Sequence, residues 1–522
     1  MLAKIESSDR HIVYQQITGI DDALIEEMKS KFLLYQKRHV IIADSFDDMR
    51  WKLDNEVKTV TINFEKSSQI CHFVESKMQL SYDQFILAQK VYVTAVLGSL
   101  SIHSIYYNHH IIVKFIDSLS HDIRDFSKYA KYSIALNDFW DILPQNSDYM
   151  IAVQEYLSDH SIPSFSHLRR QLAPFKSYFR FQEVLEDYWK TVSNESFIKF
   201  FPVWFWWNLT MILPLRVTEF TLISRDCLSC HNGQAYLTIR RTIMKKQPYI
   251  IGYSIDADYE QHQYLIPENM RREIQKYLDL TAELPPSKHD LLFRRADGIN
   301  LNRAALNSLL CKFYTEAVSQ HFMIVSKHDE LADDQITPIR LGDTRHLAMI
   351  SLILQGGNPI ICKELAGHED ISISCHYYGN ISEFVKCATY EVCRKKHSVR
   401  HSPSTFHRKR FSSEFIEIEG GRCYSLNFRN GSCSDCLHGW PQGGTLGNCD
   451  CCDYFVPSNE KRLSLNLSEK EQEIDNAFEF LCMIIAQVKK HKMDSSEIAR
   501  AANQLSAAAV RYQSAYMEVY DG

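Results

Sequence analysis

The chain has 522 residues, of which 45% are hydrophobic and 23% are charged, and its formal net charge is −6. This length predicts about three domains, and the composition excludes a disordered or fibrous protein. The acidic balance gives no general sign of a nucleic-acid partner, so a nucleic-acid site would have to come from local basic patches.

The first 75 residues predict a small ordered module. The start MLAKIESSDRH lacks the apolar segment of a secretory signal, so we expect a cytoplasmic protein. Residues 21–35 predict a helix, and the β-branched run at 57–64 predicts a strand. No motif assigns a role to this module.

Residues 76–175 are expected to be largely helical. Ser81 and Gln84 have the spacing of a capping box ahead of an apolar run. Two pairs in this region, His109-His110 and Arg169-Arg170, would suit phosphate contacts, although a solvated helix face is the more common explanation for each.

The apolar stretch at 197–215 ends directly before an arginine. Two prolines, a lysine and an asparagine interrupt it, so we expect a buried helix rather than a membrane span. Arg216 follows, and Glu219 comes three residues later. Positions i and i+3 share one helix face, so Glu219 would hold Arg216 in place. A surface ion pair is the usual explanation for such spacing alone.

Residues 226–267 predict a small antiparallel sheet with strands at 235–242, 247–254 and 263–267. Four basic residues are expected at its first turn: Arg240, Arg241, Lys245 and Lys246. A lysine pair at a hairpin tip is most often simply solvated.

The segment 340–379 holds the densest pattern in the chain. Arg345 opens an apolar helical run that Gly356-Gly357-Asn358-Pro359 ends. A shorter apolar segment then ends at Leu365-Ala366-Gly367-His368. Tyr377 lies nine residues after His368, and Tyr378 follows at once.

This order resembles the active-site block of the tyrosine recombinase (integrase) family, in which an arginine at a helix start precedes a Leu-Gly-His-like turn and a tyrosine nine residues on. The chain departs from it in placing Ala366 between Leu365 and Gly367. The segment LPLRVTEF at 213–220 is similar to the family's first arginine motif. The resemblance extends by motif over 176–396 and by layout over the preceding helical region.

The resemblance implies a mainly α fold with a small antiparallel β-sheet (α+β). It places a helical core-binding domain that clasps DNA at 76–175 and a catalytic domain at 176–400. It also implies a site-specific recombinase that integrates, excises or transposes a mobile element as a tetramer on two DNA duplexes. The expected location is the bacterial cytoplasm, in association with the nucleoid.

The family's roles then fall on five residues. Tyr377 would be the nucleophile, Arg216 and Arg345 would clamp the phosphate, and His368 would donate to its oxygens. Lys245, with Lys246 nearly as suitable, would protonate the leaving oxygen. No metal ion is needed for this chemistry.

One position departs from the pattern in a way that bears on catalysis. The family usually has a histidine or lysine three residues before its second arginine, where this chain has Gly342. Two rival functions therefore stay open, a DNA-binding accessory protein with weakened catalysis and a nicking-closing enzyme of the type IB topoisomerase kind. Tyr378 also stays open as a rival nucleophile.

A basic linker is expected after the catalytic domain. Arg394, Lys395 and Lys396 begin a run of seven basic residues that ends at Arg410. Such a run would lie along DNA phosphates or serve only as a solvated tether.

Residues 411–460 are rich in cysteine and predict a zinc module. Four thiolates at Cys433, Cys436, Cys449 and Cys452 form two CxxC pairs, which is the ligand set of structural Zn²⁺. Cys423, His438 and Cys451 are possible further ligands, and reduced free thiols are the alternative.

Residues 461–522 predict a helical hairpin. Ser468 and Glu471 have capping-box spacing before the first helix, and Asp494 and Glu497 have it before the second. Each helix has one apolar face, which predicts a partner surface in the same chain or in a neighbouring protomer.

Overall fold

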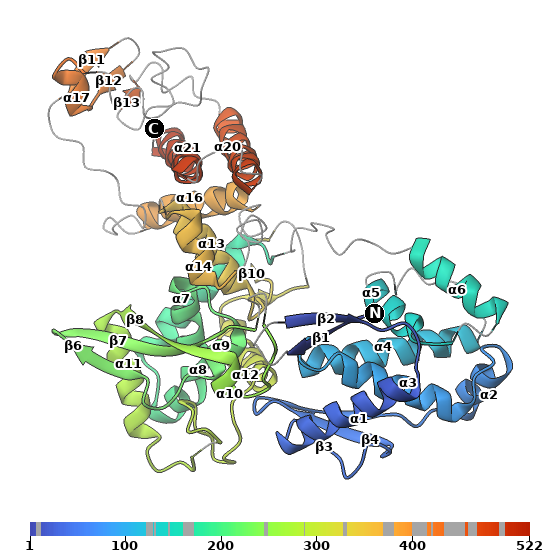
Figure 1. Cartoon of the computed structure of the whole chain (residues 1–522). Helices are drawn as coiled ribbons and strands as arrows, with labels where there is room; N and C mark the ends of the chain where they lie inside the picture. Colours follow the sequence, from blue (N-terminus) through green and yellow to red (C-terminus); the bar gives the residue numbers. More distant parts are fainter. Residues whose placement is uncertain are drawn as a thin grey trace. The chain divides into compact units, whose positions relative to one another are not determined.

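The computed structural model describes most of the chain as two compact units (Figure 1). The described residues are 1–6, 12–121, 129, 132–144, 147–159, 172–244, 249–286, 288–326, 331–355, 357–368, 380–398, 415–418, 421–432, 455–457, 467–489 and 496–521. Unit 1 consists of 1–168 with 241–261, and unit 2 consists of 169–240 with 262–522.

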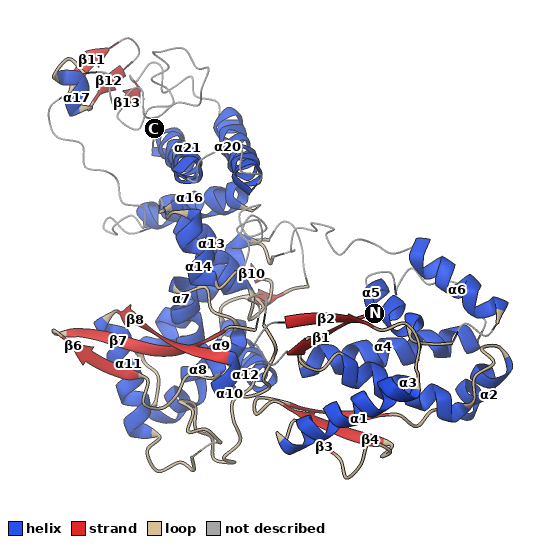
Figure 2. Ribbon diagram, in the orientation of Figure 1, coloured by secondary structure: helices blue, strands red, loops and turns tan. Residues whose placement is uncertain are grey.

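Unit 1 is mostly helical, with two small antiparallel sheets, β1–β2 and β3–β4–β5 (Figure 2). Its elements are β1 (Leu2–Glu6), β2 (Ile12–Gln16), α1 (Asp22–Lys37), β3 (Ile41–Ile42), β4 (Arg50–Asp54), β5 (Thr59–Asn63), α2 (Ser68–Ser76), α3 (Tyr82–Ala95), α4 (Ile102–Ser120), α5 (Ser133–Asp141), α6 (Asp148–Asp159) and α10 (Ile255–Asp258). The predicted capping box at Ser81 and Gln84 is present at the start of α3. Trp51 is fully buried in the core, with Phe32 and Phe64 each 4.9 Å away between ring centroids.

The two histidines of α4, His109 and His110, do not both lie on a solvated face of the helix. The helix runs through His109, which is 5% exposed, and its Nε2 is 3.0 Å from Oε1 of Gln89. His109 shares the buried face with Ile105, Ile112 and Ile116, because residues spaced three or four apart stack on one side of a helix. Both the phosphate contact and the solvated face are therefore wrong for His109.

The segment 249–258 belongs to unit 1 and differs from the prediction. A strand was expected over 247–254, but the described part of it is a loop held by the buried carboxylate of Asp258. That carboxylate accepts from the backbone N–H groups of Gly252 (2.7 Å) and Tyr253 (2.9 Å). The Tyr253 hydroxyl in turn donates to the Leu100 carbonyl at 2.5 Å. Side-chain hydrogen bonds here replace the strand ladder that the sequence pattern predicts.

Unit 2 contains the remaining elements. They are α7 (Phe175–Lys190), α8 (Asn194–Ile212), α9 (Val217–Thr221), β6 (Leu228–His231), β7 (Gln234–Thr242), β8 (Tyr259–Ile266), α11 (Glu268–Leu280), α12 (Arg303–Glu316), η2 (Val318–Gln320), β9 (Met323–Ile324), β10 (Gln335–Ile336), α13 (Asp343–Leu354), α14 (Pro359–Ala366), α16 (Ile381–Ser398), β11 (Ile416–Ile418), β12 (Gly421–Cys423), α17 (Leu426–Arg429), β13 (Phe455–Pro457), α20 (Leu467–Lys489) and α21 (Ser496–Asp521). The ends of β7 and β8, from Arg241 and up to Gln261, are counted with unit 1.

The main sheet of unit 2 has the strand order β6–β7–β8, and β6 pairs antiparallel with β7. Asn232 and Gly233 join these two strands with φ angles of 52° and 74°. Two successive positive φ angles fit the type I′ hairpin turn, for which Asn-Gly is the preferred sequence. The predicted small antiparallel sheet is thus present with different strand bounds.

Helix α8 is the centre of the unit 2 core. It packs against α11, α12 and α13, and Trp206 and Trp207 on it are almost fully buried. Phe201 stacks on Tyr277 of α11 with ring centroids 4.2 Å apart. The structure confirms the predicted buried helix ahead of Arg216. In the part of the chain that the structure describes, no helix combines the length and the apolar character of a membrane span.

Helices α20 and α21 pack against each other and against α13, α14 and α16, as Figure 1 shows at its upper end. Their buried residues, among them Ile474, Leu481, Ile498 and Leu505, belong to the same hydrophobic core as α8. The predicted apolar faces therefore find a partner within the chain. Ser468 lies inside the first turn of α20, because that helix begins one residue earlier, and Asp494 lies outside the described residues.

Candidate active site

Arg216 sits at the junction between α8 and α9, where Pro214 and an extended backbone end the first helix. Its backbone N–H donates to Oε2 of Glu219 at 2.7 Å, and its Nη1 donates to Oε1 at 3.1 Å. Glu219 is fully buried, whereas the Arg216 side chain is 23% exposed. Both carboxylate oxygens are thus used to fix one arginine, as the spacing predicts.

Arg345 is the third residue of α13 and is buried. Its Nη1 donates to the Pro214 carbonyl at 2.5 Å, and its Nη2 donates to the Ala366 carbonyl at 2.6 Å. The same Nη2 is 2.8 Å from Nε2 of His368. A guanidinium group can only donate, so Nε2 accepts and the imidazole carries no proton there.

The turn that ends α14 brings the two arginines together. Gly367 follows Ala366 in the left-handed conformation, with φ of 63°. Its carbonyl accepts from Nη2 of Arg216 at 2.8 Å, next to the Ala366 carbonyl that Arg345 contacts. Glycine adopts this conformation without steric cost, which explains why it stands at this position.

We refer to Arg216, Arg345 and His368 as the arginine–histidine cluster. Glu219 compensates one of its two positive charges, and the carbonyl partners of Arg345 are neutral. Planar guanidinium groups match the geometry of phosphate oxygens and keep their charge at any physiological pH. The cluster is therefore suited to binding an anionic phosphate diester.

Sequence reasoning did not identify the backbone carbonyls that hold Arg345. They belong to Pro214 and Ala366, residues that the motifs include only as neighbours of an arginine and a glycine. Pro214 directly after a helix end was the available signal, since proline fixes φ and ends α8 there.

Two of the five predicted catalytic residues, Lys245 and Tyr377, lie outside the described residues, as do their alternatives Lys246 and Tyr378. Gly342 is the N-cap residue of α13 and contributes no side chain. His346 directly follows Arg345 and is 6% exposed.

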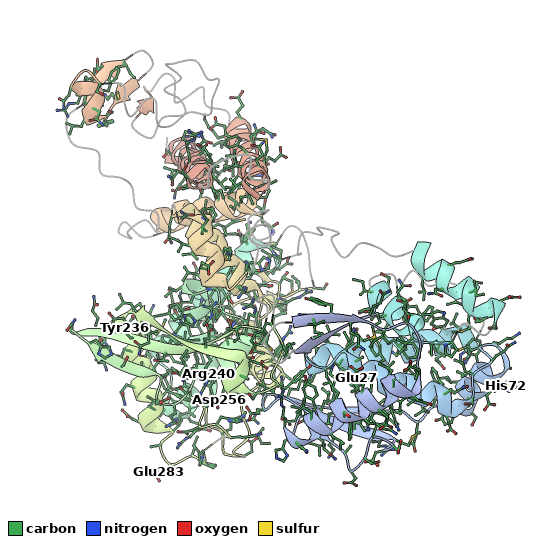
Figure 3. All side chains as sticks on the ribbon, in the orientation of Figure 1. Glu27, His72, Tyr236, Arg240, Asp256 and Glu283 are labelled. Atoms are coloured by element: carbon green, nitrogen blue, oxygen red, sulfur yellow. The ribbon has the colours of Figure 1, made fainter. Side chains whose placement is uncertain are left out.

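Arg240 and Arg241 were predicted at a turn, and this is wrong. Both lie within β7, which continues to Thr242. Arg240 is labelled on β7 in Figure 3, and its Nη1 donates to the Leu222 carbonyl at 2.8 Å. Arg241 is 6% exposed. Arg394, Lys395 and Lys396 fall within α16.

Among the described residues, no group of three His, Cys, Asp or Glu side chains has the spacing of a metal site. The four CxxC cysteines, with His438 and Cys451, lie outside those residues. Cys423 is described, is buried, and pairs in register with Phe455 across β12 and β13. The two strands bring together the chain on either side of the two CxxC pairs.

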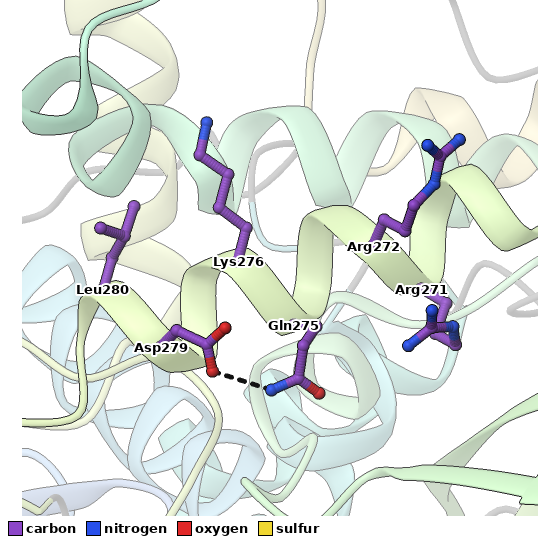
Figure 4. Close-up of a pocket in the computed structure, with 6 residues that line it drawn as sticks. All are labelled: Arg271, Arg272, Gln275, Lys276, Asp279 and Leu280. Atoms are coloured by element: carbon purple, nitrogen blue, oxygen red, sulfur yellow. Dashed lines mark hydrogen bonds between the residues drawn. The ribbon is translucent and has the colours of Figure 1, made fainter.

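A separate hollow of about 310 Å³ lies along α11 (Figure 4). Its lining residues are Arg271, Arg272, Gln275, Lys276, Asp279 and Leu280. Arg271 is paired with Glu268, and Lys276 lies 4.2 Å from the centre of the Phe197 ring. No lining residue belongs to the arginine–histidine cluster.

No known family model matches the chain, and no curated protein matches it in sequence. Among the solved structures that share a likeness with it are two recombinases and an integrase. The XerH site-specific recombinase bound to palindromic difH substrate has 11% identity and a TM-score of 0.36 over 74% of this chain and 97% of that chain. The XerA recombinase has 10% identity and a TM-score of 0.28 over 58% of this chain and 94% of that chain.

The third is the Tn1549 transposon integrase in complex with transposon right end DNA. It has 13% identity and a TM-score of 0.33 over 60% of this chain and 98% of that chain. These likenesses are to recombinases and an integrase, the class that the sequence motifs resemble. Likenesses of this strength carry no functional conclusion, so the function below rests on the geometry of the arginine–histidine cluster.

Proposed function

We propose that this chain cleaves and rejoins DNA strands as a tyrosine-type site-specific recombinase or integrase. The observation that carries the proposal is that Arg216 and Arg345, more than a hundred residues apart, both bond to the turn that holds His368. These three residues are the ones that the motifs in the sequence single out. Two guanidinium groups and an imidazole at one point form a site for a phosphate in transition.

In the proposed reaction Tyr377 loses its phenolic proton to solvent and its oxygen attacks the scissile phosphorus, while the bond from phosphorus to the 5′ oxygen breaks. The product is a 3′-phosphotyrosyl link, which preserves the energy of the phosphodiester for rejoining. Arg216 and Arg345 neutralise the non-bridging oxygens. His368, whose Nε2 accepts from Arg345, donates a hydrogen bond to them through Nδ1. Lys245 gives its proton to the leaving 5′ oxygen, with Lys246 as the alternative.

The proposed substrate is double-stranded DNA at the ends of a mobile element. Integration, excision and transposition all need two duplexes, so a homotetramer on paired sites is proposed. Arg240, which is partly exposed, and Arg394, Lys395 and Lys396 of α16 are proposed to contact DNA phosphates. Arg241 is buried and is not proposed as such a contact.

A second candidate function has one observation in its favour. Gly342 caps α13 and provides neither a base nor a donor where the family has a histidine or lysine. A DNA-binding accessory protein of recombinase fold with weakened cleavage fits that position.

Covalent trapping distinguishes the two functions. The full chain would be incubated with nicked duplexes bearing a sequence that it selects from a random pool, and DNA-linked peptides would be mapped by mass spectrometry. An adduct on Tyr377 that Tyr377→Phe abolishes supports the enzyme. An adduct on Tyr378 keeps the enzyme with a different nucleophile. Binding without any adduct supports the accessory protein.

We also propose that Cys433, Cys436, Cys449 and Cys452 hold one structural Zn²⁺. The support is the CxxC spacing together with the strand pairing that closes the chain around this segment. Elemental analysis of purified protein is expected to find about one zinc per chain. Cys436→Ser should lose it, whereas Cys311→Ser, at an exposed cysteine of α12, should keep it.

A further inference from the structure

The stretch from Thr337 to Thr344, which leads from β10 into α13, is held by buried side chains from three helices. Ser177 Oγ accepts from the Thr337 N–H (3.1 Å), and Tyr314 Oη accepts from the Ile339 N–H (3.0 Å). The donors to this stretch are Trp206 Nε1 to Leu341 O (3.2 Å), Tyr178 Oη to Asp343 Oδ2 (3.1 Å) and Thr210 Oγ1 to Thr344 Oγ1 (2.7 Å). A buried stretch outside regular structure needs such partners for its polar groups. These five hydrogen bonds fix the path of the chain as far as Thr344, the residue before Arg345.

The contact of Tyr178 differs from the others because it reaches a buried charge. Asp343 is 1% exposed, and its Oδ2 accepts from the Arg340 backbone N–H at 2.9 Å as well as from Tyr178. Asp343 is the first residue of α13, where the helix dipole favours a negative charge. A buried carboxylate with two donors holds this end of the helix in one place.

Asp343 and Arg345 share the first turn of α13. A shift of that turn moves the Arg345 side chain against the fixed carbonyls of Pro214 and Ala366. We propose that Tyr178 and Asp343 are positioning residues that set the place of Arg345, and through it the phosphate oxygens, in strand cleavage. This inference rests on the proposed function.

Tyr178→Phe keeps the aromatic ring and removes only the hydroxyl. Tyr314→Phe is the matched control, because Tyr314 is equally buried and its hydroxyl contacts the same stretch four residues before Asp343. We expect Tyr178→Phe to slow single-turnover cleavage of the nicked duplex by about 10-fold, since small misplacement of a catalytic group is costly. DNA affinity and melting temperature should match those of Tyr314→Phe.

A double-mutant cycle tests whether Tyr178 acts through the arginine. In the background of Arg345→Lys, which keeps a positive charge but loses the planar fork, adding Tyr178→Phe should change the rate by less than about 2-fold. Asp343→Asn keeps an acceptor oxygen and should recover much of the activity that Asp343→Ala loses. The contrast between Asp343→Asn and Asp343→Ala serves as the test if Tyr178→Phe does not fold, and equal rates in these two variants would overturn the inference.

Two further results would overturn the inference. Equal loss of rate in Tyr178→Phe and Tyr314→Phe, or full additivity with Arg345→Lys, would leave Tyr178 a structural residue only. If the wild-type chain cleaves no duplex that it binds, the proposed function fails and the inference fails with it. Cleavage by wild type together with either of the first two results removes the inference alone.

Discussion

Both carboxylate oxygens of Glu219 accept hydrogen bonds from a single residue, Arg216. Glu219 is buried, whereas the Arg216 side chain reaches the surface. A buried carboxylate in this position determines which way the guanidinium group faces. Its removal leaves a positive charge and a backbone N–H without their partner.

We expect Glu219→Ala to lower the free energy of unfolding of unit 2 by about 2 kcal/mol, because the Arg216 backbone N–H and guanidinium group lose a charged acceptor. Glu268→Ala is the control. Glu268 also pairs with an arginine three residues on, Arg271, but it is 58% exposed, so its loss should cost less than about 0.5 kcal/mol. Urea unfolding followed by tryptophan fluorescence measures both, and equal losses would contradict the role of burial.

His109 predicts an acid-sensitive unit 1. Burial, with smaller contributions from Lys66 and His110, lowers the pKa of His109 from 6.5 to about 3. Below pH 6.5 the His109 imidazole is protonated in the unfolded chain, whereas in the folded chain it stays neutral until about pH 3. Stability of unit 1 should therefore fall as the pH drops through this window, by about 2 kcal/mol at pH 5.

The variant His109→Gln keeps a donor for Gln89 but does not titrate. Its urea unfolding should show a weaker pH dependence between pH 7 and pH 4 than that of wild type. His72→Gln is the control, since His72 is exposed on α2 (Figure 3) and should leave the slope unchanged. An unchanged slope in His109→Gln would contradict the assignment.

At the scale of single residues, spacing and resemblance were enough to predict that Arg216, Arg345 and His368 lie close together. They were not enough to predict which atoms hold them. The contacts of Arg345 are backbone carbonyls, and a carbonyl leaves no mark in the sequence. The burial of His109 was readable from the apolar residues three and four positions away, but the neighbouring His110 suggested a polar surface.

At the scale of elements, the α14 turn depends on one backbone conformation. Gly367→Ala should cost about 1 kcal/mol of stability, since a Cβ is disfavoured at positive φ. It should also slow single-turnover cleavage by about 10-fold or more, because the two carbonyls beside it orient both arginines. Rates on a nicked duplex measure this effect.

Gly233→Ala provides the control for that prediction. Gly233 also has a positive φ, 74°, and an added Cβ there would meet no atom within 4 Å. The variant should lose similar stability and keep wild-type cleavage. Equal loss of cleavage in the two variants would show that backbone strain, rather than placement of the arginines, is responsible.

Two elements with local signals matched their predictions. Ser81 with Gln84 begins α3, and α13 ends at Leu354, ahead of the Asn358-Pro359 break, because a cap and a proline act over a short range. The strand predicted over 247–254 was wrong, since Asp258 captures the backbone N–H groups of its loop. A side-chain contact across six residues competes with strand pairing, and no periodic pattern in the sequence predicts it.

At the scale of the whole molecule, the two C-terminal helices complete the core that carries the cluster. Leu505→Ala should destabilise unit 2 by about 3 kcal/mol, because Leu505 is fully buried and truncation leaves a cavity. Val510→Ala, at a side chain 45% exposed on the same helix, should change stability by less than about 0.5 kcal/mol. A separate melting transition for α20 and α21 in calorimetry would contradict a shared core.

The sequence was enough to predict the fold class, but not which surface would cover the apolar faces of α20 and α21. Apolar faces on the last two helices predicted a partner, and helical periodicity alone does not say whether that partner is the same chain or another copy. The choice depends on the surfaces of α13, α14 and α16, which exist only in the folded unit.

The shared core has a consequence for synthesis on the ribosome. Residues 399–466 separate α16 from α20, and at roughly 5–20 residues per second their translation takes several seconds. During that interval the nascent chain already contains both arginines and His368, while α20 and α21 have yet to emerge. The timing of translation thus separates the appearance of the residues from the appearance of a finished site.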